Sequence, residues 1–548
     1  MRRATTRGVG RGTGLGAPAA ALALVLAAGA CSATGLGGSA VTLRVLAGSE
    51  IADLEPLLEE VSERTGVTVE LDYTGTLDGL ARVAGGDTDE YDAVWFGSNR
   101  YLHLHEGGRS AVRTETPVMV SPVVLGVTES RADDLGWTGG AEVTWADVSR
   151  AVEEEGLTYG MTNPGASNSG FSALIGVASA LADTGTALES DDVERVRPEL
   201  EAFFEGQEVT AGSSGWLSEA FERRAREGRP VDGLINYESV LLSLNASGVL
   251  EEPLALVHPA DGAVTADYPL TLLPDASEDT VSAYERLVED LLSGETQQRI
   301  ADDTWRRPVG QEALLRADVP PLVELPFPAH QRVVDDLVAD YVGVLRRPAR
   351  TVYVLDVSGS MQGERIDQLR SALESLTGAD GGSLARRTQA FQEREVVTLL
   401  PFATEPGEPR TFVMGPGSSD AAAEDLLTEV RSLEADGETA TYDALREAYA
   451  LLEDGSAEAA AGGSDDRYLT SVVLMTDGEV NLGWDLEEFE QSLEGLPREV
   501  ATTPVFTVLF GESDASEMSN VAEVTGGRVF DAREEELEQI FREIRGYQ

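Results

Sequence analysis

The C-terminal third of the chain alternates short apolar runs with amphipathic segments, and this alternation constrains the fold more than any other feature. The runs at 351–355, 396–400, 472–475 and 505–510 have the length and β-branched character of buried strands. The segments between them carry apolar residues at helical spacing. Strands that alternate with helices predict a doubly wound α/β sheet, in which ligands bind at the carboxyl ends of the strands.

Oxygen-bearing side chains follow two of these predicted strands. Asp356, Ser358 and Ser360 form a D-x-S-x-S loop directly after the first run, and Asp477 follows the third run in a T-D-G loop. Thr439 precedes a predicted helix in a third loop. Magnesium and calcium prefer oxygen ligands, so three such loops at one edge of a sheet can share a divalent cation.

The strand, the D-x-S-x-S loop, the threonine loop and the T-D-G loop resemble, in this order, the von Willebrand factor A family. The resemblance implies a Rossmann-like domain over 350–548 with a metal-ion-dependent adhesion site. Mg²⁺, or Ca²⁺ or Mn²⁺ in its place, would bind there and accept an acidic residue from a protein partner. The residues implied as metal ligands are Asp356, Ser358, Ser360, Thr439 and Asp477. One departure is Glu438, which stands where the family often has glycine.

Side chains suited to catalysis are missing from the region around this motif. The chain has no lysine, which excludes a P-loop lysine, a pyridoxal Schiff base and a lysine nucleophile. No imidazole base is available in 350–548, because the histidines are His103, His105, His258 and His330. We therefore expect no enzymatic activity. A metal-assisted hydrolase is the alternative, and it would need Glu438 or Glu479 as its base.

The N-terminal half contains strand-like runs that end in polar loops. The runs at 43–46, 67–73 and 91–96 lead into Gly/Ser/Thr loops, and a later run at 231–235 leads into an Asn-Tyr-Glu segment. A Ser/Asn-rich loop at 163–170 precedes an apolar helical pattern. Loops of this kind let an open α/β domain present polar groups to a small ligand.

This loop order resembles the type II extracellular solute-binding proteins of ABC importers and implies a bilobed fold over 42–316. The positions that match the family's ligand-facing loops are Ser49, Thr76, Ser98, Ser167, Ser169 and Tyr237. No basic residue marks a pocket for an oxyanion, so the class of solute stays open.

The N-terminus has the features of an export signal. Arg2 and Arg3 precede an uncharged apolar run at 17–30, and Cys31, the single cysteine, follows three small residues. This arrangement resembles a bacterial lipobox, in which the cysteine is lipidated. We predict a signal peptide at 1–31 and a flexible tether at 32–41. The lone cysteine also excludes an internal disulfide and a Cys-rich zinc site.

The charge of the chain restricts its partners. It has 97 acidic and 41 basic residues, for a formal net charge of −56. Such a surface repels nucleic acid and anionic headgroups, so we expect no nucleic-acid partner and membrane attachment through the lipid alone.

Between the domains, the segment 317–349 holds a proline-rich stretch and a helical pattern that can pack on either domain. An Ala/Gly/Ser/acid-rich stretch at 454–466 predicts a loop.

These features predict a lipid-anchored binding protein on the outer face of the cell membrane. One domain would bind a small polar solute, and the other would make metal-dependent contacts with a protein. Two alternatives stay open. One is a transport receptor with the C-terminal domain as an accessory, and the other is a structural adhesin in which the two-lobed domain is only a scaffold.

Overall fold

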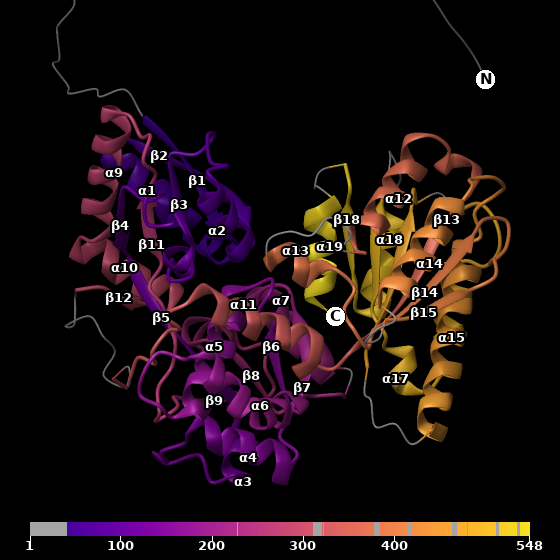
Figure 1. Cartoon of the computed structure of the whole chain (residues 1–548), viewed down its shortest axis with the longest axis horizontal. Coiled ribbons are helices and arrows are strands. Elements are labelled where there is room, and N and C mark those ends of the chain that lie inside the picture. The colour runs from indigo at the N-terminus through magenta and orange to yellow at the C-terminus, as the bar shows by residue number, and fades with distance from the viewer. Residues whose placement is uncertain are drawn as a thin grey trace, which may run out of the picture. The chain divides into compact units, whose positions relative to one another are not determined.

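The computed structural model describes residues 41–226, 228–310, 320–321, 323–377, 384–414, 419–462, 468–478, 480–510, 515–533 and 537–547 (Figure 1). The predicted signal peptide, Cys31 and nearly all of the tether lie outside these residues, and so does Glu479. No described helix has both the length and the apolar character that are needed to cross a membrane.

The first lobe is built on a five-stranded sheet with the order β2-β1-β3-β11-β4. Its strands are β1 (Val41–Gly48), β2 (Val67–Thr74), β3 (Ala93–Trp95), β4 (Thr114–Pro117) and β11 (Pro269–Leu272). Strands β1, β2 and β3 are parallel. The helices α1 (Glu55–Thr65), α2 (Thr76–Gly85) and α9 (Glu278–Leu291) bury their apolar residues in the same core as β1. The carboxyl ends of β1 and β3 therefore lie at one edge of this sheet.

The second lobe is built on a seven-stranded sheet with the order β10-β5-β8-β6-β7, to which β9 and β12 add by pairing with β5. The strands are β5 (Met119–Thr128), β6 (Tyr159–Thr162), β7 (Gln207–Ala211), β8 (Gly233–Tyr237), β9 (Leu254–Val257), β10 (Thr265–Ala266) and β12 (Arg307–Pro308). The helices are α3 (Glu129–Asp134), α4 (Trp145–Glu155), α5 (Asn168–Ala182), α6 (Ser190–Glu205), α7 (Ser214–Arg226) and α8 (Glu238–Ser247), and α10 (Gly294–Thr304) precedes β12. The chain passes between the two sheets at 117–119 and again at 266–269, which confirms the predicted two-lobed α/β fold.

The helix after the proline-rich stretch belongs to the N-terminal domain. Helix α11 (Gln331–Asp340) and the π-helical turn η4 (Tyr341–Leu345) bury Val334, Leu337 and other apolar side chains in the core shared with α5 and α6. The Tyr341 hydroxyl also donates to Gln207 Oε1 at 2.9 Å. The sequence left the position of this helix open, and these long-range contacts decide it.

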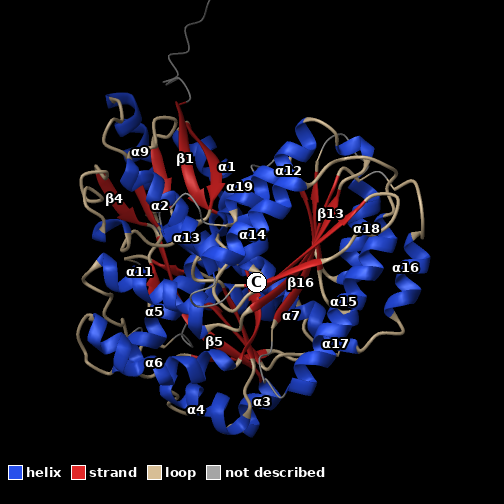
Figure 2. Ribbon diagram, turned by 45° about the vertical axis from the view of Figure 1, so that its right-hand side comes forward, coloured by secondary structure: helices blue, strands red, loops and turns tan. Residues whose placement is uncertain are grey.

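The C-terminal domain is the doubly wound sheet that the alternating pattern predicts (Figure 2). Its strands are β13 (Ala349–Asp356), β14 (Val396–Phe402), β15 (Arg410–Val413), β16 (Leu469–Thr476), β17 (Val505–Leu509) and β18 (Arg528–Asp531), in the order β15-β14-β13-β16-β17-β18. All neighbours are parallel except the edge strand β15, which runs antiparallel to β14.

Helices cover both faces of this sheet. One core contains side chains of α12 (Glu364–Ser375), α14 (Ser419–Ser432) and α19 (Leu537–Gly546). The other contains side chains of α15 (Thr441–Gly462), α16 (Leu486–Leu493) and α18 (Ala515–Thr525). The prediction of a loop over 454–466 is wrong for its first part, because α15 continues to Gly462. The alanines in this stretch favour a helix. The loop prediction gave more weight to the glycine, serine and acidic residues of the same stretch.

Candidate functional sites

The first predicted metal loop begins where the central strand β13 ends. Asp356 is the last residue of β13 and is fully buried. Its Oδ1 accepts a hydrogen bond from the Ser358 backbone N–H at 2.9 Å, and its Oδ2 accepts one from the Thr476 hydroxyl at 2.6 Å. The Ser358 and Ser360 Oγ atoms lie 3.0 Å apart. The carboxylate and both hydroxyls are therefore held in one tight loop at the carboxyl edge of the sheet.

The threonine loop contacts the first loop through the backbone. The Gly359 N–H donates to the Gly437 carbonyl at 3.0 Å, and a Cβ at Gly359 would lie 3.2 Å from that oxygen, so a side chain there would crowd this contact. Thr439 is buried, and its N–H donates to Asn481 Oδ1 at 2.9 Å in the loop that follows β16. The structure thus brings the three predicted loops together.

Asp477 completes the set of predicted carboxylates, and Arg365 is paired with it. Asp477 is buried after β16, and its Oδ2 lies 2.6 Å from Arg365 Nη1. The same nitrogen donates to the Ser360 carbonyl at 3.1 Å. Arg365 was not among the predicted site residues. Its place on the first turn of α12, directly after the serine loop, is the signal that could have found it.

The donor atoms at this edge fit a divalent cation. The pKa of the Asp356 carboxyl is raised, first because the group is buried and also because Asp477 is near; the hydrogen bonds from Ser358 and Thr476 oppose this rise. A divalent cation would offset the repulsion between two carboxylates. Within the described part of the chain, no group of three or more His, Cys, Asp and Glu side chains could hold a metal ion. A cation bound here would therefore need the hydroxyls of Ser358, Ser360 and Thr439 in addition to the two carboxylates.

The two lobes of the N-terminal domain meet closely around Gly97, at the end of β3. A Cβ at this position would lie 2.6 Å from Asn168 Nδ2 in the second lobe and 2.9 Å from Glu50 Oε1 in the first. Asn168 is the first residue of α5, and its Nδ2 donates to the Tyr237 hydroxyl at 2.8 Å. The Gly97 carbonyl accepts from the Tyr268 N–H at 3.1 Å. We name Glu50, Gly97, Asn168, Tyr237 and Tyr268 the inter-lobe cluster.

Two acidic side chains at this contact, Glu50 and Asp267, form no ion pair with another described residue, although the charge of Arg306 acts to lower the pKa of Glu50. Glu50 is half-buried, but its Oε1 is shielded from solvent and, among the described residues, has no hydrogen-bond partner; the same holds for Asp267 Oδ1. Burial is the largest cause that raises the pKa of both carboxyls. The nearby Arg306 is committed elsewhere, since it binds Asp53 Oδ2 at 2.6 Å and the Glu50 carbonyl at 2.6 Å.

The six predicted ligand contacts are distributed unevenly. In the second lobe, Ser169 is buried beside Thr162 and Ser214, and its Oγ lies 3.1 Å from the Oγ of the half-buried Ser167, while Tyr237 belongs to the inter-lobe cluster. In the first lobe, Ser98 Oγ accepts from the Arg100 N–H in a local turn, Thr76 is buried at the start of α2, and Ser49 is exposed.

The predicted ligand contacts of the second lobe therefore lie close to one another. In the first lobe, the side chains at the contact between the lobes are not the predicted ones. Glu50 and Asn168 were not predicted although they adjoin predicted residues, because the prediction rested on small hydroxyl side chains. Tyr268 has no comparable local signal, since it reaches the cluster only through the pairing of β11 with β3.

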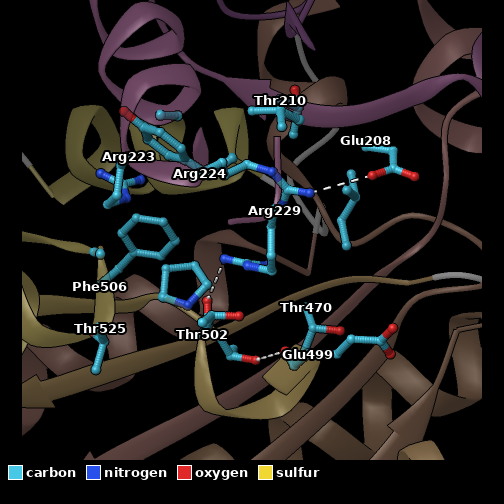
Figure 3. Close-up of a pocket in the computed structure, with 18 of the residues that line it drawn as sticks. Glu208, Thr210, Arg223, Arg224, Arg229, Thr470, Glu499, Thr502, Phe506 and Thr525 are labelled. Carbon is cyan, nitrogen blue, oxygen red and sulfur yellow. Dashed lines mark hydrogen bonds and ion pairs between the residues drawn. The ribbon is translucent and has the colours of Figure 1, made fainter. Parts of the chain in front are cut away.

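A further pocket of about 1110 Å³ lies outside both sites. Arg223, Arg224 and Arg229 extend into it near Thr502 and Phe506 (Figure 3). The lining also includes Arg347, Arg350 and Arg528. These arginines have partners: Arg224 lies 3.4 Å from Glu208 Oε2, and Arg229 Nη2 lies 3.5 Å from the Thr502 carbonyl. In this acidic chain the pocket, which we call the arginine pocket, is a local concentration of positive charge.

Comparison with known families agrees with the two folds. Residues 43–306 match the model for bacterial extracellular solute-binding proteins, and residues 352–543 match the model for the von Willebrand factor type A domain. The chain therefore carries a solute-binding domain followed by a von Willebrand factor A domain.

Individual relatives match only part of this chain. An inter-alpha-trypsin inhibitor heavy chain from Sus scrofa is 30% identical over 136 residues, which cover 25% of this chain and only 13% of that protein. The periplasmic binding protein AfuA from Actinobacillus pleuropneumoniae matches with a TM-score of 0.41 and 13% identity, over 55% of this chain and 97% of its own. The sulfate-binding protein SubI from Mycobacterium tuberculosis matches with a TM-score of 0.41 and 17% identity, over 54% and 98%.

Proposed function

We propose that this protein is a non-enzymatic binding protein on the outer face of the cell membrane, anchored by a lipid on Cys31. Its N-terminal domain binds a small polar solute between the two lobes. Its C-terminal domain binds a protein partner through a divalent cation. The observation that carries the proposal is the meeting of three loops around two buried carboxylates, Asp356 and Asp477, at the carboxyl edge of the sheet.

The chain's own residues have separate tasks at this edge. Asp356 and Asp477 supply negative charge, and the hydroxyls of Ser358, Ser360 and Thr439 supply neutral oxygens. The bonds from the Ser358 N–H and the Thr476 hydroxyl hold the Asp356 carboxylate in one orientation. A bound Mg²⁺, Ca²⁺ or Mn²⁺ would supply a Lewis-acidic position for a carboxylate of the partner.

The metal-dependent part of the proposal is tested with a short peptide. The purified protein is titrated with MgCl₂, MnCl₂ and CaCl₂ by isothermal titration calorimetry, and then with a peptide that carries one Asp between glycines. We expect the Asp peptide to bind only when metal is present, and the matched Asn peptide not to bind. Equal binding of the Asp peptide in EDTA would overturn the adhesion site.

The location is tested separately. The solute-binding family is one of extracellular proteins, and the predicted lipobox supplies the anchor. Cells that express Cys31→Ala should release the protein into the soluble fraction or retain the uncleaved precursor. A variant that is processed normally and stays in the membrane fraction contradicts the anchor while leaving both binding sites untouched.

A further inference from the structure

The arginine pocket lies at the amino edge of the C-terminal sheet, whereas the candidate metal site lies at the carboxyl edge. The parallel strands β13, β16, β17 and β18 each contribute one of their first two residues to the lining: Arg350, Thr470, Phe506 and Arg528. Residues of β7 and α7 also line the pocket, and the arginines of α7 extend into it (Figure 3). With about 1110 Å³, the pocket can hold a small molecule that carries several functional groups.

Positive charge exceeds negative charge in the part of this pocket that is shielded from solvent. Five of the lining arginines are half-buried: Arg223, Arg224, Arg229, Arg347 and Arg350. The carboxylates of the lining are Glu208, Glu219 and Glu499, of which Glu219 and Glu499 are exposed. Arg224 and Arg347 both contact Glu208, at 3.4 and 3.8 Å, so two guanidinium groups share this half-buried carboxylate. Like charges repel more strongly when they are partly removed from water, and an anion relieves that repulsion.

The electrostatics of a helix end explain only part of the cluster. Arg223 and Arg224 lie in the last turn of α7, where the carboxyl end of the helix favours positive charge. Arg347 precedes β13, Arg350 lies within this strand, and Arg528 begins β18. These arginines are far apart in the sequence and meet only in the folded chain, so no single element accounts for their convergence.

Arg350 carries a half-buried charge that no carboxylate balances among the described residues. Its guanidinium carbon lies 4.3 Å from the centroid of the Tyr468 ring, and no described side chain forms an ion pair with it. The guanidinium of Arg528 lies in the same way 4.2 Å over the Trp216 ring, although it also contacts Glu543 Oε2 at 3.4 Å. Stacking on a ring uses the face of a guanidinium and leaves its in-plane N–H groups available to phosphate or carboxylate oxygens.

We propose that the arginine pocket binds a small multivalent anion, whose phosphate or carboxylate oxygens accept hydrogen bonds from Arg350 and from the arginines of α7. The anion is small, because the net charge of −56 repels large polyanions such as nucleic acid. No residue of the inter-lobe cluster or of the candidate metal site belongs to this lining. The inference therefore does not rest on the proposed function, and its failure would leave that function untouched.

The test uses the full chain and three ligands in the presence of EDTA, so that no metal ion at Asp356 can hold an anion. Pyrophosphate carries phosphate oxygens, and propane-1,2,3-tricarboxylate carries carboxylates. Glycerol has the same three-carbon backbone as the tricarboxylate and is the neutral control. Affinity is measured by calorimetry and by the unfolding midpoint, which rises when a ligand prefers the folded state. We expect at least one anion to bind and glycerol not to bind, and the anion that binds more tightly identifies the preferred oxygen group.

Three variants locate the binding. Arg350→Gln removes a guanidinium that has no ion pair to lose, and it should weaken anion binding by about tenfold or more, because a charge-assisted hydrogen bond is lost. Glu208→Gln removes the carboxylate that competes with the anion for Arg224 and Arg347, so it should strengthen binding. Arg332→Gln removes an equal charge from an exposed side chain outside the lining and should bind as the parent does.

The unfolding midpoint without ligand separates altered binding from misfolding, and Arg350→Gln should unfold near the midpoint of the parent. If this variant does not fold, Arg528→Gln takes its place with the same expected loss, because it changes an exposed residue of the same lining. The inference is overturned if neither anion binds, if glycerol binds as tightly as the anions, or if removal of the arginine leaves the affinity unchanged. Weaker binding in Glu208→Gln would also overturn it, since the pocket would then act through its shape and not through its charge.

Discussion

Asp356 in the C-terminal domain and Glu50 in the N-terminal domain both have carboxylate oxygen shielded from solvent, but their surroundings differ. Asp356 receives one hydrogen bond on each oxygen, from Ser358 and Thr476, and a second carboxylate lies nearby. Glu50 Oε1 receives none from the described residues. The Asp356 carboxylate is therefore held in one orientation, whereas Glu50 is left with an unmet acceptor.

This contrast indicates two modes of recognition in one chain. A pair of fixed carboxylates with hydroxyls at one sheet edge suits a small hard ion, which demands a defined oxygen shell. A single unsatisfied carboxylate between two lobes suits a ligand that enters when the lobes open and gives its donors when they close. The next experiments test whether the two acids really differ in this way.

The largest effect is expected at Asp356. Asp356→Ala removes a carboxylate and its charge, so the affinity for Mn²⁺ and Mg²⁺ should fall by about 100-fold or more, since even residues that only support a metal ligand contribute 10–100-fold. Calorimetry with MnCl₂ measures this loss. Asp367→Ala, which removes an exposed carboxylate from the same domain, should bind as the parent does. A parent-like affinity in Asp356→Ala would remove the basis for the comparison.

A smaller effect is expected at Gly97. A methyl group there would collide with Asn168 and Glu50, so Gly97→Ala should lower the free energy of unfolding by about 1–3 kcal/mol through overpacking. Urea denaturation measures the change. Gly215→Ala is the matched control, because a Cβ there meets nothing within 4 Å, and it should be neutral or slightly stabilising. Equal stabilities of the two variants would show that the lobes do not meet at Gly97.

The stability of the parent, which carries a carboxylate at Glu50, should depend on pH differently from the stability of Glu50→Gln, which carries a neutral amide. The folded-state pKa of Glu50 is raised above its ordinary value of 4.5 by burial. The ionised group therefore destabilises the native state near neutral pH, and this penalty is lost as the pH falls through the folded-state pKa. Glu50→Gln should be more stable than the parent by about 1 kcal/mol near neutral pH, with the advantage shrinking toward lower pH. An advantage that is independent of pH would contradict an ionised Glu50.

The smallest effect is expected at Arg365. Its guanidinium pairs with Asp477 and so competes with a bound cation for that carboxylate. Arg365→Gln keeps a donor that can reach the Ser360 carbonyl but removes the charge, so Mg²⁺ affinity should rise by about threefold. Calorimetry with MgCl₂ measures the change, and Arg370→Gln, on the same helix and paired with Asp367, serves as the control. A fall in affinity would show that Arg365 supports the loops more than it competes.

Much of the C-terminal domain could be predicted from local sequence. Asp356 and Asp477 each follow a short apolar strand, and parallel neighbours place such residues at one edge, so the pattern predicted both the sheet and the meeting of its loops. The antiparallel edge strand β15 and the full length of α15 were not predicted, because their runs are short or of ambiguous composition.

In the N-terminal domain, the sequence determined the elements and the polar loops, while tertiary structure decided which loop residues meet. The helix at 331–340 was visible from its periodicity, but only its contact with the N-terminal core assigned it to a domain. Glu50, Asn168 and Tyr268 are far apart in the chain, and their proximity depends on strand pairing and on the approach of two lobes. Local patterns record which face of a strand or helix is buried, but the unmet acceptor at Glu50 arises only from groups brought together across the fold.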